Sequence, residues 1–192
     1  MQELLRNIIK KVQRKSGDYS ELDLIQGLSI EEVIALQEEF SVQFPVDYQE
    51  ALKLYGKTVD YPGFDGYVIG IPHFGEMLLM TEQQLITAYR LLLQIEPKPC
   101  THSVKKLEGI FWSPQWIPIT QYGGFLVSKS LSIYHMMVLD ENSPLYGNII
   151  GWDYRSGPTH LVAESFKAYM VEFDRALNST GLFWDETYGF SF

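Results

Sequence analysis

The sequence of 192 residues is long enough for one good-sized domain, and its 46% hydrophobic and 20% charged residues are ordinary for a globular protein. Its formal net charge of −9 argues against nucleic-acid binding, which depends on Lys and Arg neutralising phosphates. The charge is compatible with a basic protein partner, and the alternative is that it serves solubility alone. The single cysteine, Cys100, and the absence of a signal-peptide pattern or a long apolar run predict a cytoplasmic protein with no disulfide and no membrane span.

Three helices are predicted in the first third of the chain. Residues 3–15 carry apolar side chains at helical spacing on one face. A second helix begins at Ser29, because Ser29 and Glu32 have the spacing of a capping box. Pro45 opens a third helix, since proline is tolerated at a helix start, and Gly56 stands where a glycine C-cap belongs.

Turn-forming residues and short apolar runs follow. A loop rich in Gly, Pro and Asp leads into a predicted strand at residues 67–71, and a second strand is expected at 77–80. Thr81 and Gln84 repeat the capping-box spacing and begin another helix. That helix ends at a long polar loop over residues 96–109.

The next stretch combines tryptophans, prolines and a double glycine. Trp116 and its β-branched neighbours predict a buried strand. Pro118 cannot donate a hydrogen bond to a neighbouring strand, so this strand is expected to lie at a sheet edge or to leave the sheet there. Gly123-Gly124 predicts the turn that follows.

The last third of the chain is predicted to hold strands, then a helix and a tail. Strands are expected at residues 125–128, 133–139 and 148–154, and they favour an antiparallel meander. A helix is expected at 161–177. The aromatic tail, residues 181–192, is expected to pack on its own domain, with docking on a partner as the alternative. The order of elements predicts an α+β fold with a mainly antiparallel sheet.

Patterns that would indicate catalysis are weak. Cys100 and His102 are close in sequence, but such neighbours rarely form a nucleophile–base pair. His160 and Glu164 could share a helix face as metal ligands, yet no third ligand is in register. The sequence therefore predicts no catalytic residue, no metal site and no cofactor.

Three blocks, in this order and spacing, resemble the SUKH superfamily, which includes fungal cell-wall glucan-synthesis regulators and many bacterial toxin-immunity proteins. They are Leu28-Ser29 through Phe44-Pro45-Val46-Asp47-Tyr48 to Tyr55-Gly56; Trp116-Ile117-Pro118-Ile119 with Gly123-Gly124; and Leu139-Asp140 through Gly147-Asn148-Ile149-Ile150 to Val162–Tyr169. The resemblance covers about residues 27–175 of a single predicted domain, 1–192, and leaves the helix in 1–16 and the tail 181–192 as extensions. Gln121 and Tyr122 stand where the family often carries an acidic residue.

The resemblance implies helices packed on a mixed, largely antiparallel sheet, and a non-catalytic protein-binding role. The first hypothesis is an immunity protein that neutralises a basic toxin domain, for example a nuclease. The second is a regulatory scaffold related to the fungal cell-wall synthesis regulators. The third, an enzyme, has the least support from the residues.

The residues predicted to contact a partner are acidic or tyrosine side chains in loops and turns, because opposite charge speeds encounter and tyrosine is enriched at binding hot spots. They are Asp60, Tyr61, Asp65, Tyr122, Asp140, Glu141 and Asp153. Aspartates at turns also often bond the local backbone, which is the alternative interpretation of these acids.

Overall fold

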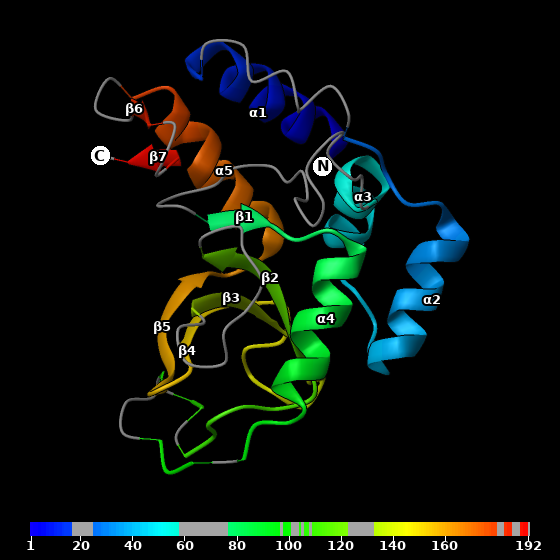
Figure 1. Cartoon of the computed structure of the whole chain (residues 1–192), viewed down its shortest axis with the longest axis vertical. Helices are drawn as coiled ribbons and strands as arrows, with labels where there is room; N and C mark the ends of the chain where they lie inside the picture. Colours follow the sequence, from blue (N-terminus) through cyan, green and yellow to red (C-terminus); the bar gives the residue numbers. More distant parts are fainter. Residues whose placement is uncertain are drawn as a thin grey trace, which may run out of the picture.

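The computed structural model describes residues 1–16, 25–57, 77–96, 98–100, 104, 106–107, 109–122, 133–179, 183–185 and 189–191; for 77–78, 121–122, 183–185 and 189–191 it describes the backbone alone. The helices are α1 (Gln2–Lys15), α2 (Ile30–Phe40), α3 (Val46–Tyr55), α4 (Glu82–Leu92) and α5 (Phe166–Leu177). The strands are β1 (Met77–Leu79), β2 (Trp116–Tyr122), β3 (Ile133–Val138), β4 (Ile149–Asp153), β5 (Gly157–Ala163), β6 (Phe183–Asp185) and β7 (Gly189–Ser191). The predicted α+β class is confirmed (Figure 1). The predicted loop and strand at 60–71, Gly123-Gly124 and the strand at 125–128 lie outside the described residues.

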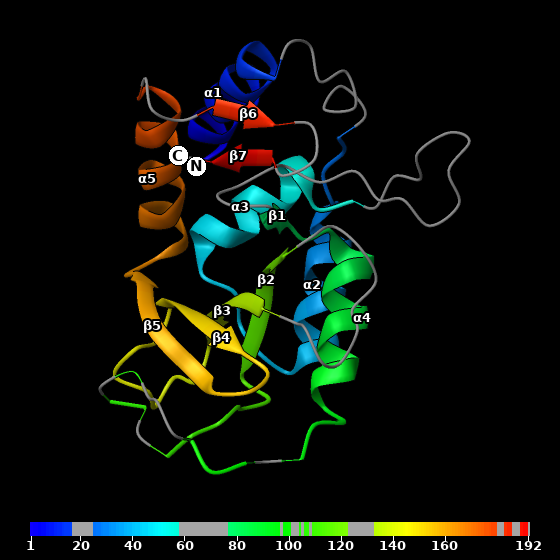
Figure 2. The same ribbon diagram turned by 60° about the vertical axis from the view of Figure 1, so that its left-hand side comes forward.

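The main sheet is a meander in which strands adjacent in sequence are adjacent in space. Its order is β1-β2-β3-β4-β5, and every described pair is antiparallel. Strands β6 and β7 form a separate hairpin in the tail, and both views place it beside α1 and α5 (Figures 1 and 2). Because the side chains of this hairpin are not described, the packing of the tail aromatics stays a prediction.

The expectation that Pro118 marks a sheet edge is wrong for the strand as a whole. Strand β2 lies between β1 and β3. However, β1 pairs only with residues 120–122, so it stops short of Pro118, and the pairing of β2 with β3 shifts register between Pro118 and Thr120. A short neighbour and a bulge are the ways in which a sheet accommodates a proline that cannot donate.

The predicted helix at 161–177 begins too early. Residues 157–163 form β5, which pairs with β4, and α5 starts after Ser165. Ser165 is the N-cap, and its side chain accepts a hydrogen bond from the backbone N–H of Ala168 at 3.0 Å. The apolar residues before this cap have a helical spacing, but their pairing with β4 holds them in a strand.

The two predicted capping residues and the family motif around Asp47 position the helices. Ser29 and Glu32 make both bonds of the capping box on α2, at 3.1 and 2.7 Å. Asp47, in the first turn of α3, accepts from the backbone N–H of Lys167 at 2.8 Å, so one side chain joins the starts of α3 and α5. Tyr48 then packs against Phe166, with ring centroids 4.9 Å apart.

Gly56 ends α3 for a different reason from the one predicted. Its φ of −68° is right-handed, so no left-handed cap is present. A side chain there would instead collide with α3 and with the chain before α2, because an added Cβ would lie 2.7 Å from the Leu52 carbonyl oxygen and 2.9 Å from Leu28 Cγ. Space, rather than backbone conformation, requires glycine here.

Helices α2 and α4 lie side by side in both views (Figures 1 and 2). Phe40 and Tyr89 pack with ring centroids 4.7 Å apart, and Arg90 of α4 forms an ion pair with Glu39 of α2 at 2.8 Å. On the sheet, the indole N–H of buried Trp152 donates to the carbonyl oxygen of Phe111 at 2.8 Å. No helix in the described part of the chain is long and apolar enough to cross a membrane.

Candidate functional site

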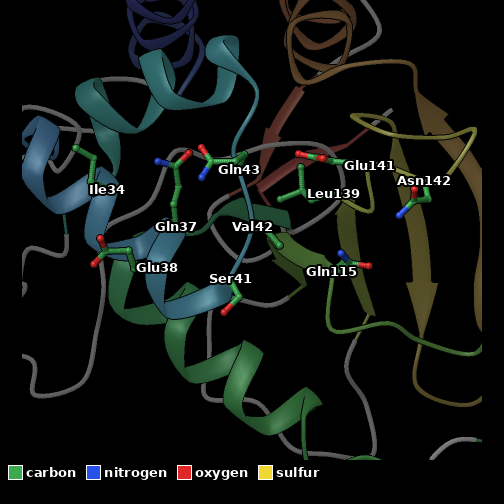
Figure 3. A pocket seen from close by; sticks show the side chains of 10 residues that line it. All are labelled: Ile34, Gln37, Glu38, Ser41, Val42, Gln43, Gln115, Leu139, Glu141 and Asn142. Carbon is green, nitrogen blue, oxygen red and sulfur yellow. The ribbon is translucent and has the colours of Figure 1, made fainter.

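A groove of about 600 Å³ opens between the C-terminal half of α2 and the turn that follows β3 (Figure 3). Its walls come from segments that are far apart in the sequence. The lining residues are Ile34, Gln37, Glu38, Ser41, Val42, Gln43, Gln115, Leu139, Glu141 and Asn142.

The floor of the groove is apolar and firmly held. Val42 and Leu139 are buried, and Leu139 is tied to Gln115 because its N–H donates to the Gln115 carbonyl at 2.8 Å. Buried Gln37 accepts a hydrogen bond from the Phe44 N–H at 2.8 Å, which fixes the chain as it leaves α2. The groove is therefore a preformed feature of the fold.

The rim of the groove is polar and its side chains have free bonding capacity. Glu38 projects from α2 and Glu141 from the turn on the opposite side (Figure 3). Within the described part of the chain, neither carboxylate makes a hydrogen bond or an ion pair, and the side-chain amides of Gln43, Gln115 and Asn142 are likewise unbonded. A partner could use these groups without breaking any bond that holds the fold.

An exposed apolar strip adjoins the groove. Ile30 and Ile34 lie one turn apart on the outer face of α2 and are 58% and 47% exposed, while the turn after β3 exposes Tyr146. Apolar side chains beside a groove with a polar rim are typical of a protein-binding surface.

One predicted contact residue, Glu141, lines this groove, and the other described acids make local bonds. Asp140 Oδ1 accepts from the Asn142 N–H at 2.9 Å, which shapes the turn that presents Glu141. Asp153 Oδ1 accepts from the N–H groups of Arg155 and Ser156 at 2.7 and 3.1 Å. These two aspartates therefore bond the local backbone, which was the alternative interpretation of acids at turns.

The structure does not bring all the predicted contact residues together. Asp140 follows β3 and Asp153 ends β4, so in this antiparallel pair they lie at opposite ends of the sheet. The backbone of Tyr122 pairs with Met77 in β1, but its side chain is not described. Asp60, Tyr61 and Asp65 lie outside the described residues.

A polar contact between the sheet and α5 involves the half-buried His135 of β3. Its Nδ1 lies 2.6 Å from the hydroxyl oxygen of Tyr169 on α5. Burial, with a smaller effect of the nearby His160, lowers the pKa of His135 from 6.5 to about 4, and burial raises the pKa of the Tyr169 hydroxyl well above its ordinary range. A neutral imidazole that faces a phenol has a packing role here, since it lies partly buried between α5 and the sheet.

The shared helix face considered for His160 and Glu164 is not present in the structure. His160 lies on β5 and Glu164 follows that strand, so their spacing does not put them on one helix face. Among the described residues, no group of three or more His, Cys, Asp or Glu side chains could hold a metal ion. Cys100 Sγ lies 3.3 Å from the carbonyl oxygen of Ser156, and His102 lies outside the described residues.

Sequence reasoning missed most of the groove, although one local signal was present. Ile30 and Ile34 are out of phase with the inward-facing Val33, Leu36 and Phe40 of the same helix. An isoleucine pair on the outer face of a helix indicates a surface with something to contact. The pairing of that surface with residues 139–142 had no signal in the sequence.

A model of the SMI1/KNR4 family (SUKH-1) matches residues 27–172. The chain belongs to this family. The matched residues include the whole groove of this SUKH-1 chain and agree with the predicted core of about 27–175, whereas α1 and the tail hairpin lie outside the match. The comparison with curated proteins gives no match.

Proposed function

We propose that this SUKH-1 chain is a non-catalytic protein-binding domain that acts as an immunity protein: it binds and neutralises a basic toxin domain of a polymorphic toxin system. Membership of the family over residues 27–172 carries the proposal, because the superfamily includes many toxin-immunity proteins. The net charge of −9 supports it, since many such toxins are nucleases with basic surfaces.

The decisive experiment is rescue from toxicity. The toxin domain encoded beside the gene for this chain is induced in a bacterial host with the chain or with an empty vector. We expect colony counts with the chain to match those of uninduced cells. Undiminished killing, with the chain present at normal levels on an immunoblot, contradicts the proposal. If the chain gives no rescue but stably binds cell-wall or signalling proteins, the regulatory scaffold is favoured instead.

A titration with purified proteins separates binding from catalysis. If the chain only masks the toxin, inhibition of toxin activity reaches its end point near equal molar amounts and does not grow with incubation time. An enzyme that modifies the toxin would inactivate it at a small fraction of that amount, with an effect that increases with time. This second result would refute the non-catalytic role.

A further inference from the structure

We propose that the groove between α2 and the turn after β3 is the docking site for a basic loop of the partner protein, with an arginine side chain inserted between the two walls that carry Glu38 and Glu141. This inference rests on the proposed function for the identity of the partner as a toxin. It assigns a surface and a recognition chemistry that the function alone does not specify.

The first argument is the charge at the end of α2. The C-terminus of a helix carries a partial negative charge that favours a cation nearby. Helices α1, α3, α4 and α5 each have an arginine or lysine in the last turn, but α2 has none there and carries Glu38 and Glu39 instead. Arg90 of α4 pairs with Glu39, which leaves Glu38 on the groove side with the helix end. This end of α2 is therefore suited to a cation from outside the chain.

The second argument is that both groove acids lack a partner within the described chain and also line one concave surface, a combination that other exposed acids such as Glu31 and Glu164 do not show. Glu32, Glu39 and Glu172 each pair with a lysine or arginine of this chain. Glu38 and Glu141 are both exposed, and neither has an ion-pair partner within the described residues. Both line the same groove, Glu38 from α2 and Glu141 from the turn on the other side (Figure 3). A merely solvated acidic face needs no such concavity.

The third argument concerns the kind of cation. A guanidinium presents five N–H donors in a planar fork, whereas an ammonium is a compact point charge. The rim offers two carboxylates and the unbonded amide oxygens of Gln43, Gln115 and Asn142, which is more acceptors than an ammonium uses. The apolar floor of Val42 and Leu139 suits the aliphatic stem of the same side chain. Arginine fits both features.

The exposed strip on α2 extends the site beyond one side chain. Ile30 and Ile34 would contact apolar residues that flank the arginine in the partner loop. Arginine and aromatic residues are enriched at the centres of protein interfaces, and exposed rims contribute less. We therefore expect the groove to bind a short segment of mixed basic and apolar character rather than a scattered positive surface.

The first test is a double charge reversal, Glu38→Lys with Glu141→Lys, measured by calorimetry against the purified toxin domain. We expect the double variant to bind the toxin domain at least about tenfold more weakly than wild type does. Raising the salt concentration should weaken binding of the variant less than it weakens binding of the wild type. The matched control is the double variant Glu3→Lys with Glu172→Lys, which reverses two exposed acids outside the groove and changes the net charge by the same amount. It should bind like wild type.

The fold of the double variant provides its own check. Both acids are exposed and unbonded within the described chain, and a lysine at position 38 improves the charge at the end of α2. We expect its Tm to equal or exceed that of wild type, so weaker binding would not reflect unfolding. Equal affinities of wild type and the double variant overturn the groove assignment while the immunity role stands.

The second test does not need the toxin. The ¹⁵N-labelled chain is titrated with the peptide acetyl-Leu-Arg-Arg-Leu-amide, and with its lysine and glutamate counterparts. We expect the arginine peptide to shift the backbone amides of Val42, Leu139 and Glu141 several-fold more than the lysine peptide does, and the glutamate peptide to leave them unchanged. Shifts spread evenly over other acidic surfaces contradict the assignment. If the peptide maps to the groove but the chain neither binds nor neutralises the toxin, the immunity role fails and the docking site remains.

Discussion

Acidification should destabilise this protein through His135 before most of its carboxylates titrate. The imidazole lies partly buried between the sheet and α5, and this burial lowers its pKa from 6.5 to about 4. Because the folded state favours the neutral ring, its stabilising effect is fully present above pH 6.5 and is lost as the pH falls towards 4. At about 1.4 kcal/mol per pKa unit, the full loss is about 3 kcal/mol.

The effect is already large at mild pH. Between pH 7 and pH 5 the unfolded imidazole becomes protonated while the folded one remains mostly neutral, which removes about 2 kcal/mol from the free energy of unfolding. The measurement is urea denaturation at both pH values for wild type and for His135→Asn. An asparagine side chain offers both an oxygen that accepts and an amide group that donates, so it can bond the Tyr169 hydroxyl whichever way the proton points, but it does not titrate.

The comparison isolates the histidine from other titrating groups. His135→Asn should be less stable than wild type at pH 7 because the ring is lost, and its further loss at pH 5 should be about 2 kcal/mol smaller than that of wild type. The control is His160→Asn, which replaces an exposed histidine on β5 and should keep most of the wild-type pH dependence. Equal pH dependence of wild type and His135→Asn would refute the reasoning.

Four further substitutions concern stability in urea denaturation. Gly56→Ala should cost about 1–3 kcal/mol, because its Cβ would lie 2.7 Å from a backbone carbonyl oxygen of α3. Gly151→Ala should cost less than Gly56→Ala, since its Cβ meets only the exposed side chains of His160 and Thr159 rather than backbone, and the reverse order would contradict the packing argument. Trp152→Phe should cost about 2 kcal/mol by leaving the buried Phe111 carbonyl without its donor, and a neutral change would show that another group replaces it. Ser41→Gly should stabilise by about 0.5–1 kcal/mol, because Ser41 ends α2 with a φ of 54°, and destabilisation would mean that its side chain holds the turn.

The helices with local start signals were the most predictable parts of the fold. The capping box at Ser29 and Glu32 is complete in the structure, because both partners lie within one turn and need nothing else to form. The start of α5 was misplaced because the residues of β5 have a helical spacing of apolar side chains, while their pairing with β4 is a long-range interaction. The same limit explains Pro118, since the length of β1 decides which part of β2 has a second neighbour.

The candidate site was predictable only in part. Glu141 was selected because it is an acid in a turn, and the structure places it on the groove. Asp153 had the same sequence signature, yet its carboxylate is occupied by the backbone of its own turn. Glu38 was missed because a glutamate on a helix surface looks like a solvated side chain, and only its position at the end of α2 and across from Glu141 distinguishes it.

The sequence by itself determined the α+β class, the family blocks, the acidic charge and most helix boundaries, since these depend on composition and on interactions within a few residues. Tertiary structure alone decided that Asp47 joins α3 to α5, that Gly56 is required by space, and that the end of α2 meets the turn after β3. In each case the atoms in contact come from segments far apart in the chain, and only the packed core brings them together.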